Sequence, residues 1–467
     1  MRKTLLIGVS AFVLGAGTMA YLNHPALASV AASSPAEAFK MLELFADVRH
    51  TVETEYVVPV DDKKLIRAAI DGMLTSLDPH SGYLNPDDYK DLQEQTEGAY
   101  GGLGLEVTSE DGAVKVVTPM DDTPAARAGI QSGDYITAID KQSVLGLPLN
   151  DAVKKMRGAV GAPIELTVAR PGKDPFEVKL VRESIHVVSA KGHMEGDYAY
   201  LRVSAFNETT TEQALATIKD LQAKNPHIKG WVLDLRNNPG GLLDQAVSIS
   251  SLFLNGGEVV EQRGRDPRDI ERYNATGGDR LHGLPMVTLV NSGTASAAEI
   301  VAGALQDRRR SAIVGITSFG KGSVQSIIPL RDGDNDALRL TIARYFTPSG
   351  RSIQKAGIEP DLEVAESDDQ AQALANDAFQ FSEASFSNAL NAAEAKTRRP
   401  PHAPAEAPPK DYDVKKDFQL QRSLDVLKYG SVAAVPKLPA APPKIAAYMT
   451  SKPVPGAPAA PAPAPHP

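Results

Sequence analysis

The sequence predicts an α/β fold, because segments of strand character alternate with segments of helical periodicity. The apolar runs Tyr198–Val203 and Gly230–Leu235 have the length of buried strands, and Ala214–Leu221 between them has helical spacing. A further apolar run, Met286–Val290, precedes a helical pattern that begins near Ser296. This order favours a sheet with parallel pairs of strands and helices packed on it.

The composition fits a globular protein and excludes several kinds of site. The chain has 467 residues, of which 42% are hydrophobic and 23% charged, enough for about two to three domains. A net charge of −9 predicts no nucleic acid partner. Because the chain has no cysteine, thiol nucleophiles, disulfides and thiolate metal sites are excluded. The nine histidines show no metal-ligand spacing, so we predict neither a metal site nor a cofactor.

The first 28 residues have the pattern of an export signal. Arg2 and Lys3 precede the apolar stretch Leu5–Ala20, and small residues follow at Ala26 and Ala28. This pattern predicts cleavage after Ala28, and the alternative is an uncleaved membrane anchor. Either way, the body of the protein is expected in the periplasm or elsewhere outside the cytoplasm.

Residues 29–96 are predicted to form a helical segment. Apolar residues recur there at three- and four-residue spacing, first at Phe39, Leu42, Phe45, Val48 and Val52, and then at Leu65, Ile66, Ala69, Ile70, Met73 and Leu74. A stripe of this kind is either part of a core or a face for a partner.

Residues 97–184 change to short alternating strands, and their motifs resemble a PDZ domain. The P-A-x-x-A-G-I-x-x-G-D pattern at Pro124–Asp134 follows a glycine-rich turn made of Gly102, Leu103, Gly104 and Leu105. In a PDZ domain, backbone N–H groups of such a turn bind a peptide α-carboxylate, and the next strand edge accepts the peptide as an added strand.

Ser296 is a candidate nucleophile and Lys321 a candidate base. Ser296 lies among small residues in the first turn of a predicted helix, where unpaired N–H groups and the helix dipole favour negative charge. Lys321 follows in a turn flanked by Gly320 and Gly322. On local grounds alone, a serine at such a position is most often only a helix cap.

The lysine turn also matches most of a phosphate-binding loop, from Gly315 to Lys321. The hydroxyl residue that would hold Mg²⁺ is replaced by Gly322, and Val324–Leu330 continues as a strand where that loop requires a helix. The nucleotide interpretation is therefore disfavoured.

Longer motifs resemble the carboxyl-terminal processing peptidases, a family of Ser-Lys proteases, over roughly residues 40–365. They are N-S-G-T-A-S-A-A-E-I at Asn291–Ile300, F-G-K-G-S-V-Q at Phe319–Gln325, Ala343–Gln354 and Gly357–Asp361. The resemblance implies a crotonase-like α/β protease core with an inserted PDZ domain and an N-terminal helical segment. It also implies oligomerisation through the residues before the PDZ domain.

The same resemblance assigns the nucleophile to Ser296, the base to Lys321 and an assisting amide to Gln325. One departure is visible, because the family often has S-A-S-A-S-E around the nucleophile. Here Thr294 and Ala298 replace the two flanking serines, while the middle serine is kept. A Ser-His pairing stays open at the level of sequence, with His186, His193 and His282 as its candidates.

The segment Asp234–Gly241, D-L-R-N-N-P-G-G, lies where a strand ends and a helix is predicted to begin. Ligand sites gather at such positions, although a plain turn is the alternative. The resemblance makes this turn the second wall of an oxyanion hole, with N–H groups from Gly241, preferred over Gly240, and from Ala297.

Beyond Asp361 the signal weakens. We expect a helical segment at about residues 370–395, a Pro-rich linker at Arg398–Pro409, a short amphipathic helix at Asp417–Leu427 and a disordered Pro/Ala-rich tail from Ala433. The predicted boundaries are 1–28 for the signal or anchor, 29–96 for the helical segment, 97–184 for the PDZ domain, 185–365 for the protease core, 366–432 for a helical and linker segment, and 433–467 for the tail.

The function expected from the sequence is that of an exported serine endopeptidase that recognises protein C-termini through its PDZ domain. Its partners would be protein or peptide substrates with accessible C-termini, with an adaptor protein and a second copy of the chain as further candidates. The alternative is a catalytically idle PDZ scaffold that binds periplasmic peptides.

Overall fold

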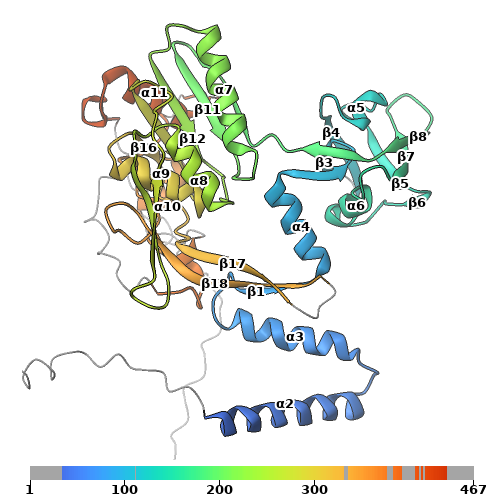
Figure 1. The fold of residues 1–467 in the computed structure, drawn as a ribbon. Coiled ribbons are helices and arrows are strands. Elements are labelled where there is room, and N and C mark those ends of the chain that lie inside the picture. Colours follow the sequence, from blue (N-terminus) through green and yellow to red (C-terminus); the bar gives the residue numbers. More distant parts are fainter. Residues whose placement is uncertain are drawn as a thin grey trace, which may run out of the picture. The chain divides into compact units, whose positions relative to one another are not determined.

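The computed structural model describes residues 34–438 except 111, 331–334, 376–381, 392–404, 410–411 and 414–415 (Figure 1). The predicted export signal and most of the predicted tail lie outside these residues. No helix in the described ranges is both long enough and apolar enough to cross a membrane.

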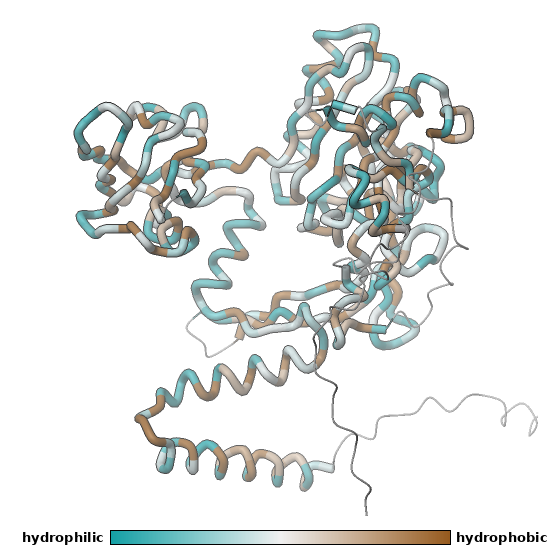
Figure 2. Tube along the Cα trace, turned by 180° about the vertical axis from the view of Figure 1, so that it is seen from behind, coloured by the Kyte–Doolittle hydropathy of each residue, from teal (hydrophilic) through white to brown (hydrophobic). Residues whose placement is uncertain are grey.

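The first unit of the chain ends at Ile70 and contains α2 (Pro35–Glu55) and most of α3 (Asp62–Thr75). Ser34 caps α2 in a capping box with Glu37. Figure 2 shows hydrophobic residues recurring along α2. Phe39, Leu42, Phe45 and Val48 of the predicted apolar stripe are 43–67% exposed. Within this chain the stripe is therefore not core.

The second unit begins at Asp71, and its predicted PDZ segment forms a sheet of short antiparallel strands. The strand order is β3-β4-β5-β7-β8, with β6 paired to β5. Its elements are β3 (Leu105–Glu110), β4 (Ala113–Pro119), α5 (Pro124–Arg127), β5 (Tyr135–Ile139), β6 (Gln142–Ser143), α6 (Leu149–Met156), β7 (Pro163–Ala169) and β8 (Phe176–Val181). These elements enclose a separate core that includes Val116, Ile136 and Leu166.

Two short strands flank this segment. β2 (Ala99–Gly102) pairs antiparallel with β9 (Glu183–His186), and α4 (Pro86–Glu97) precedes β2. β2 comes just before the first strand of the PDZ sheet, and β9 comes just after the last strand. Their pairing therefore holds the two ends of the PDZ segment together.

The main sheet has the order β10-β11-β12-β15-β16-β19. All neighbours from β11 onward are parallel, as the alternation of strands and helices predicts, and only β10 is antiparallel to its neighbour. The strands are β10 (Ala190–Glu195), β11 (Tyr198–Val203), β12 (Gly230–Asp234), β15 (Met286–Val290), β16 (Ala312–Gly315) and β19 (Leu362–Glu363).

Helices cover both faces of this sheet, so β12 and β15 are buried along their whole length. Trp231 and Leu233 share one core with α7 (Thr210–Lys224), α8 (Leu243–Ser251) and α9 (Ala297–Asp307). Val232 and Val287 share another with α11 (Phe418–Tyr429). The alternation of side chains along a strand assigns successive residues to the two layers.

A second sheet has the order β1-β18-β13-β14, with β17 paired to β18. Its strands are β1 (Gly82–Leu84), β13 (Gly257–Arg263), β14 (Ile270–Ala275), β17 (Ser323–Pro329) and β18 (Ala337–Phe346). β17 agrees with the strand predicted at Val324–Leu330. The turn that contains Lys321 leads directly into this strand.

The helix expected at about residues 370–395 is confirmed at residues 370–375 and is wrong at residues 382–391, while the rest of it lies outside the described residues. α10 spans only Asp368–Ala375, and Glu383–Ser385 form a short 3₁₀ turn, η1. The backbone N–H of Glu383 donates to Phe319 O at 2.9 Å. The backbone of Glu383 is thus bonded to the lysine turn of the protease core.

The structure also corrects the linker and the start of the tail. Glu406 forms a parallel bridge with Val364, and Ala405 and Ala407 are buried. Val435, just beyond the short turn η2 (Val432–Ala434), is buried in the layer of α11. Apolar contacts therefore extend into segments whose Pro-rich composition predicts none. The amphipathic helix expected at Asp417–Leu427 is confirmed as α11.

Candidate active site

The predicted nucleophile lies at a sharp turn between a buried strand and a buried helix. β15 ends at Val290 and α9 begins at Ala297, and Ser296 between them has φ 54° and ψ −119°. A non-glycine residue with this backbone conformation is strained, and such strain concentrates at functional sites. Ser296 thereby lies at the amino-terminal end of α9, where the helix dipole favours a developing negative charge.

The backbone N–H groups of Ala297 and Gly241 are the predicted oxyanion donors. Neither donates to an acceptor within the described ranges of the chain. The Gly240 N–H, in contrast, donates to Asn238 Oδ1 at 2.9 Å. A Cβ on Gly240 would lie 2.8 Å from Ser296 Cβ, so the two turns touch and a side chain at 240 would collide. This geometry favours Gly241 over Gly240, and the role of Gly241 stays a prediction.

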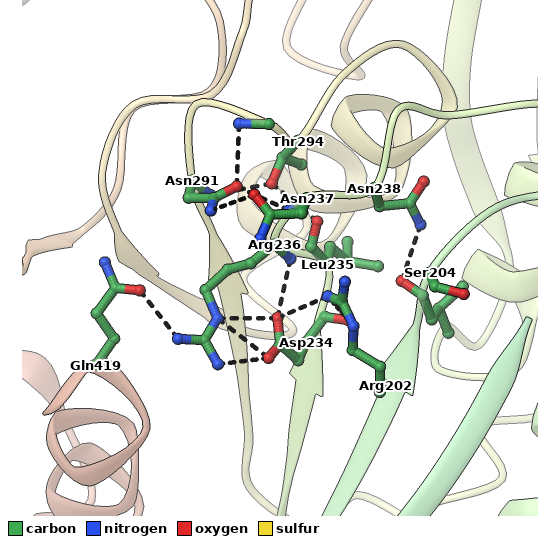
Figure 3. A network of polar contacts seen from close by, with 12 residues as sticks. Arg202, Ser204, Asp234, Leu235, Arg236, Asn237, Asn238, Asn291, Thr294 and Gln419 are labelled. Atoms are coloured by element: carbon green, nitrogen blue, oxygen red, sulfur yellow. Dashed lines mark hydrogen bonds and ion pairs between the residues drawn. The ribbon is translucent and has the colours of Figure 1, made fainter. Parts of the chain in front are cut away.

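The predicted oxyanion turn is fixed by charged residues at the end of β12 (Figure 3). Arg236 Nη2 lies 2.6 Å from Asp234 Oδ2. Asp234 also accepts hydrogen bonds from Tyr200 Oη and Arg202 Nη1. Burial alone would raise the pKa of Asp234, but the hydrogen bonds and charge of Arg236 lower that pKa below its usual value. Asp234 therefore stays ionised and holds the start of the turn.

Helix α11 supports the same turn from the other face of the sheet. Arg236 Nη2 lies 2.6 Å from Asp417 Oδ2, and Arg236 Nη1 donates to Gln419 Oε1 at 3.1 Å (Figure 3). Gln419 Nε2 donates to Val364 O at 2.7 Å. The sequence did not indicate this support, because Asp417 and Arg236 are far apart in the chain.

Asn291 and Thr294 join the serine turn to the oxyanion turn. The Asn237 N–H donates to Asn291 Oδ1 at 2.8 Å, and Asn291 Nδ2 donates to Asn237 Oδ1 at 2.9 Å. Thr294 Oγ1 donates to Leu235 O at 2.9 Å (Figure 3). Thr294, one of the two departures from the usual family pattern, thus has a structural role of its own.

The turn that carries Lys321 is held by its backbone groups. These bonds run from Phe319 N–H to Thr294 O at 3.0 Å, from Gly322 N–H to Gln354 Oε1 at 2.9 Å, and from Lys355 N–H to Gly320 O at 2.8 Å. The lysine turn is therefore attached both to the serine turn and to the chain that follows β18.

A single buried carboxylate, that of Glu299, connects the two turns. Glu299 Oε2 accepts from the N–H groups of Ser296 at 2.9 Å and Lys321 at 2.8 Å. Its Oε1 accepts from the Gly320 N–H at 2.7 Å and the Ser318 hydroxyl at 2.5 Å. Burial raises the pKa of Glu299 to about 7, against the lowering effect of these hydrogen bonds. The Ser-x-x-Glu spacing from Ser296 to Glu299 is that of a capping box at a helix start. This spacing is the sequence signal from which Glu299 could have been predicted.

The Lys321 side chain is half-buried, and its surroundings suit a base. Burial lowers the pKa of its amine, and the charge of Arg339 lowers it further. The carboxylates of Glu383, Glu299 and Asp78 act in the opposite direction. Within the described residues, the amine makes no hydrogen bond with Ser296, so the predicted dyad stays a prediction.

Among the described residues, Gln325 forms no hydrogen bond with the Lys321 amine. Its Nε2 donates to Ser323 Oγ at 2.9 Å and to Thr341 Oγ1 at 3.1 Å. Thr341 donates in turn to Asp78 Oδ1 at 3.1 Å. The amide is thus held on β17 and β18, next to the turn that carries the lysine.

The three histidines considered for a Ser-His pairing, His186, His193 and His282, are exposed. None of them forms a hydrogen bond with Ser296 in the part of the chain that the structure describes. The histidine near the site is His80, whose Nε2 lies 2.7 Å from Glu383 Oε2. Sequence reasoning missed both members of this pair.

The predicted peptide-binding turn follows β2 and precedes β3. Gly104 has φ 73°, and a Cβ there would lie 2.3 Å from the Thr123 side chain. The N–H groups of Leu103 and Gly104 donate to no acceptor within the described residues. Leu105 begins β3, which is an edge strand of its sheet, and Gly102 ends β2. These features are what an incoming peptide terminus would need.

Comparisons with known proteins agree with this fold. Residues 197–364 match the model of peptidase family S41, residues 115–170 match a PDZ domain, and residues 14–88 match the N-terminal domain of the activating protease CtpB. The fold and the matches define a serine peptidase with a PDZ domain. The predicted α/β protease core with an inserted PDZ domain is confirmed.

The chain belongs to the carboxy-terminal processing proteases of peptidase family S41. It is 52% identical over 339 residues to the carboxy-terminal-processing protease of Bartonella bacilliformis, covering 72% of this chain and 78% of that relative. It is 35% identical over 370 residues to the protease CtpB of Bacillus subtilis, covering 76% and 75% respectively. A solved structure, the photosystem II D1 C-terminal processing protease, is 31% identical and covers 69% of this chain and 86% of its own, with a TM-score of 0.42. Peptides are therefore the substrate class.

Proposed function

We propose that this protease is exported, cuts its substrates with a Ser296–Lys321 dyad and selects them by their C-termini through the PDZ domain. The observation that supports the dyad most is the Glu299 carboxylate, which accepts hydrogen bonds from the backbone of Ser296 and of Lys321. One side chain thus fixes the nucleophile turn and the base turn relative to each other. A scaffold that only binds peptides has no need of this arrangement.

In this mechanism the neutral amine of Lys321 accepts the proton of the Ser296 hydroxyl as the oxygen attacks the scissile carbonyl carbon. The carbonyl oxygen becomes negative and receives hydrogen bonds from the N–H groups of Ala297 and Gly241. The ammonium of Lys321 then protonates the leaving amine. Water, deprotonated by the same amine, hydrolyses the acyl-enzyme. In this structure the Gln325 amide is bonded to the hydroxyls of Ser323 and Thr341. In the proposed mechanism the Gln325 side chain turns away from these hydroxyls and forms a hydrogen bond with the Lys321 amine.

The test is incubation of the protein without residues 1–28 with an unfolded protein that ends in apolar residues. Mass spectrometry should show fragments that lack the substrate's C-terminal end, and the Ser296→Ala variant should yield none. If the wild type binds the substrate but leaves it intact, the idle scaffold is the better description.

Amidation of the substrate's C-terminus is expected to lower the cleavage efficiency by about tenfold or more. It removes the charge that the N–H groups near Gly104 would bind, and a hydrogen bond to a charged group contributes roughly 1.5–3 kcal/mol. Rates are compared for the free acid and the amide of one peptide. Equal rates for the two would contradict C-terminal recognition by this turn.

We further propose that the mature chain starts at Ser29 and associates with a second copy through α2. The apolar stripe Phe39–Val48 is exposed on a helix that contributes no buried residue to this chain. Protein recovered from outside the cytoplasm should begin at Ser29 by mass spectrometry and sediment as a dimer. The double variant Leu42→Asp, Phe45→Asp should sediment as a monomer, and a wild-type monomer would refute the self-association.

A further inference from the structure

The segment Ser382–Asn391 follows the stretch that matches the peptidase family, yet it lies against the turn that carries Lys321. The backbone N–H of Glu383 donates to Phe319 O at 2.9 Å, two residues before the lysine. At the other end of the segment, Asn388 Nδ2 donates to Thr75 O at 2.7 Å. Both ends of the segment are thereby attached to the protease unit.

The Glu383 side chain is fully buried, and both of its oxygens have partners. Its Oε1 accepts from Gln354 Nε2 at 2.8 Å, and its Oε2 lies 2.7 Å from His80 Nε2. Gln354 Oε1 in turn accepts from the Gly322 N–H at 2.9 Å. A buried carboxylate is costly unless it is hydrogen-bonded, so these partners and Glu383 depend on one another. The chain of contacts ends on the residue next to Lys321.

His80 links the same carboxylate to Arg339 of β18. The backbone carbonyl of His80 accepts from Arg339 Nε at 2.8 Å, while its ring contacts Glu383. The charged groups that act on the Lys321 amine are Arg339 of β18, Glu299 of α9, Asp78 before β1, and Glu383. Of the three carboxylates, the contribution of Glu383 is the largest.

Aromatic rings of the same region cover the turn. Phe386 packs edge-on against Phe319, with ring centroids 6.5 Å apart, and against the His80 ring at 6.3 Å. These rings reduce the access of water to the contacts of Glu383. In such surroundings a charge acts more strongly on its neighbours than it does in water.

We propose that Glu383 is a positioning residue for the reaction: through its backbone N–H and through Gln354 it holds the turn that carries Lys321, and His80 joins the same carboxylate to Arg339. This inference rests on the proposed Ser296–Lys321 mechanism. It places part of the active site in a segment beyond the residues that match the peptidase family. It also explains why His80 and Gln354 both bind the Glu383 carboxylate.

The test compares Glu383→Ala, Glu383→Gln and the matched control Asp369→Asn, an exposed carboxylate of α10, in the full mature chain. Values of kcat and KM are measured with one peptide that has a free C-terminus, from pH 5 to 10. Glu383→Ala should lower kcat by about 10²-fold, the order expected from a misplacement of about 1 Å, with KM unchanged. The control should match the wild type.

Glu383→Gln keeps an oxygen that can accept from Gln354, so it should retain most of kcat. Because it removes the negative charge that favours the protonated amine, the rising limb of its pH profile should move to lower pH. A residue that only supports the fold would not move this limb. A kcat for Glu383→Ala within twofold of the wild type would overturn the inference. If Glu383→Ala does not fold, the inference is overturned when the rising limb of the pH profile of Glu383→Gln lies at the same pH as that of the wild type.

Lys321→Arg, assayed alongside, separates the two hypotheses. If this variant keeps its activity, the proposed dyad itself fails. If it is inactive while the Glu383 variants behave as the wild type, only the inference about Glu383 fails.

Discussion

Lys321→Arg is expected to lower kcat by about 10²–10⁴-fold, the range that a general base contributes. A guanidinium keeps its proton at every accessible pH, so it cannot accept the proton of the Ser296 hydroxyl. KM should change little, because the proposed recognition of the substrate by the PDZ domain does not involve the Lys321 side chain. The measurement is steady-state cleavage of one peptide, with the exposed Lys191→Arg as the matched control.

The same assignment predicts how the wild-type activity depends on pH. Burial lowers the pKa of the Lys321 amine, and Arg339 lowers it further. If the neutral amine is the base, as proposed, activity should rise as pH increases through that lowered pKa, which lies below the ordinary lysine value of 10.5. A Lys321→Arg variant with substantial turnover and the wild-type pH profile would show that another group is the base.

Glu299→Gln is expected to lower kcat by about 10²-fold, the order for a misplacement of about 1 Å between reacting groups. The amide would present an NH₂ group where Glu299 now accepts from two donors, so two buried donors would lose their acceptor. Each such loss costs about 1–3 kcal/mol. Both kcat and the thermal midpoint should therefore fall.

Glu212→Gln is the matched control for this experiment, because Glu212 is the third residue of α7 as Glu299 is the third of α9, but exposed. The control should leave kcat and the thermal midpoint unchanged. A Glu299→Gln enzyme within fivefold of the wild type would mean that the carboxylate does not align the two turns.

The pKa of Glu299 also fixes the sign of a stability effect. Its folded-state pKa, about 7, lies above the ordinary 4.5, so the folded chain holds this proton more tightly than the unfolded chain. The contribution of Glu299 to the free energy of unfolding is therefore complete below pH 4.5 and is lost as pH rises towards 7. The ionised form of Glu299, which accepts all four hydrogen bonds, therefore gives a smaller free energy of unfolding than the protonated form does.

The sequence predicts those features of the site that arise locally. The buried strand Met286–Val290, the helix start at Ser296 and the strand after Lys321 each follow from a short run of residues and its periodicity. The family resemblance adds the roles of single residues. The choice of Gly241 over Gly240 agrees with the hydrogen bond that occupies the Gly240 N–H.

The features that the sequence does not predict depend on contacts between distant residues. Glu383 reaches His80 across about three hundred positions, and no local pattern marks either residue. The helix expected around Glu383 fails for the same reason, because its backbone bonds to Phe319 outweigh local helical preference. Likewise, the Pro-rich composition around Glu406 conceals a strand-like pairing with Val364.

The hold of α11 on Arg236 makes the enzyme sensitive to the state of its own carboxyl end. Arg236 lies at the start of the predicted oxyanion turn, and it is bound by Asp417, the N-cap of α11, and by Gln419 in the first turn of that helix. A copy shortened upstream of Asp417 loses both contacts and uncovers the sheet face around Val232. We therefore expect a copy that ends before Asp417 to hold the predicted oxyanion turn less firmly and to cleave its substrates more slowly.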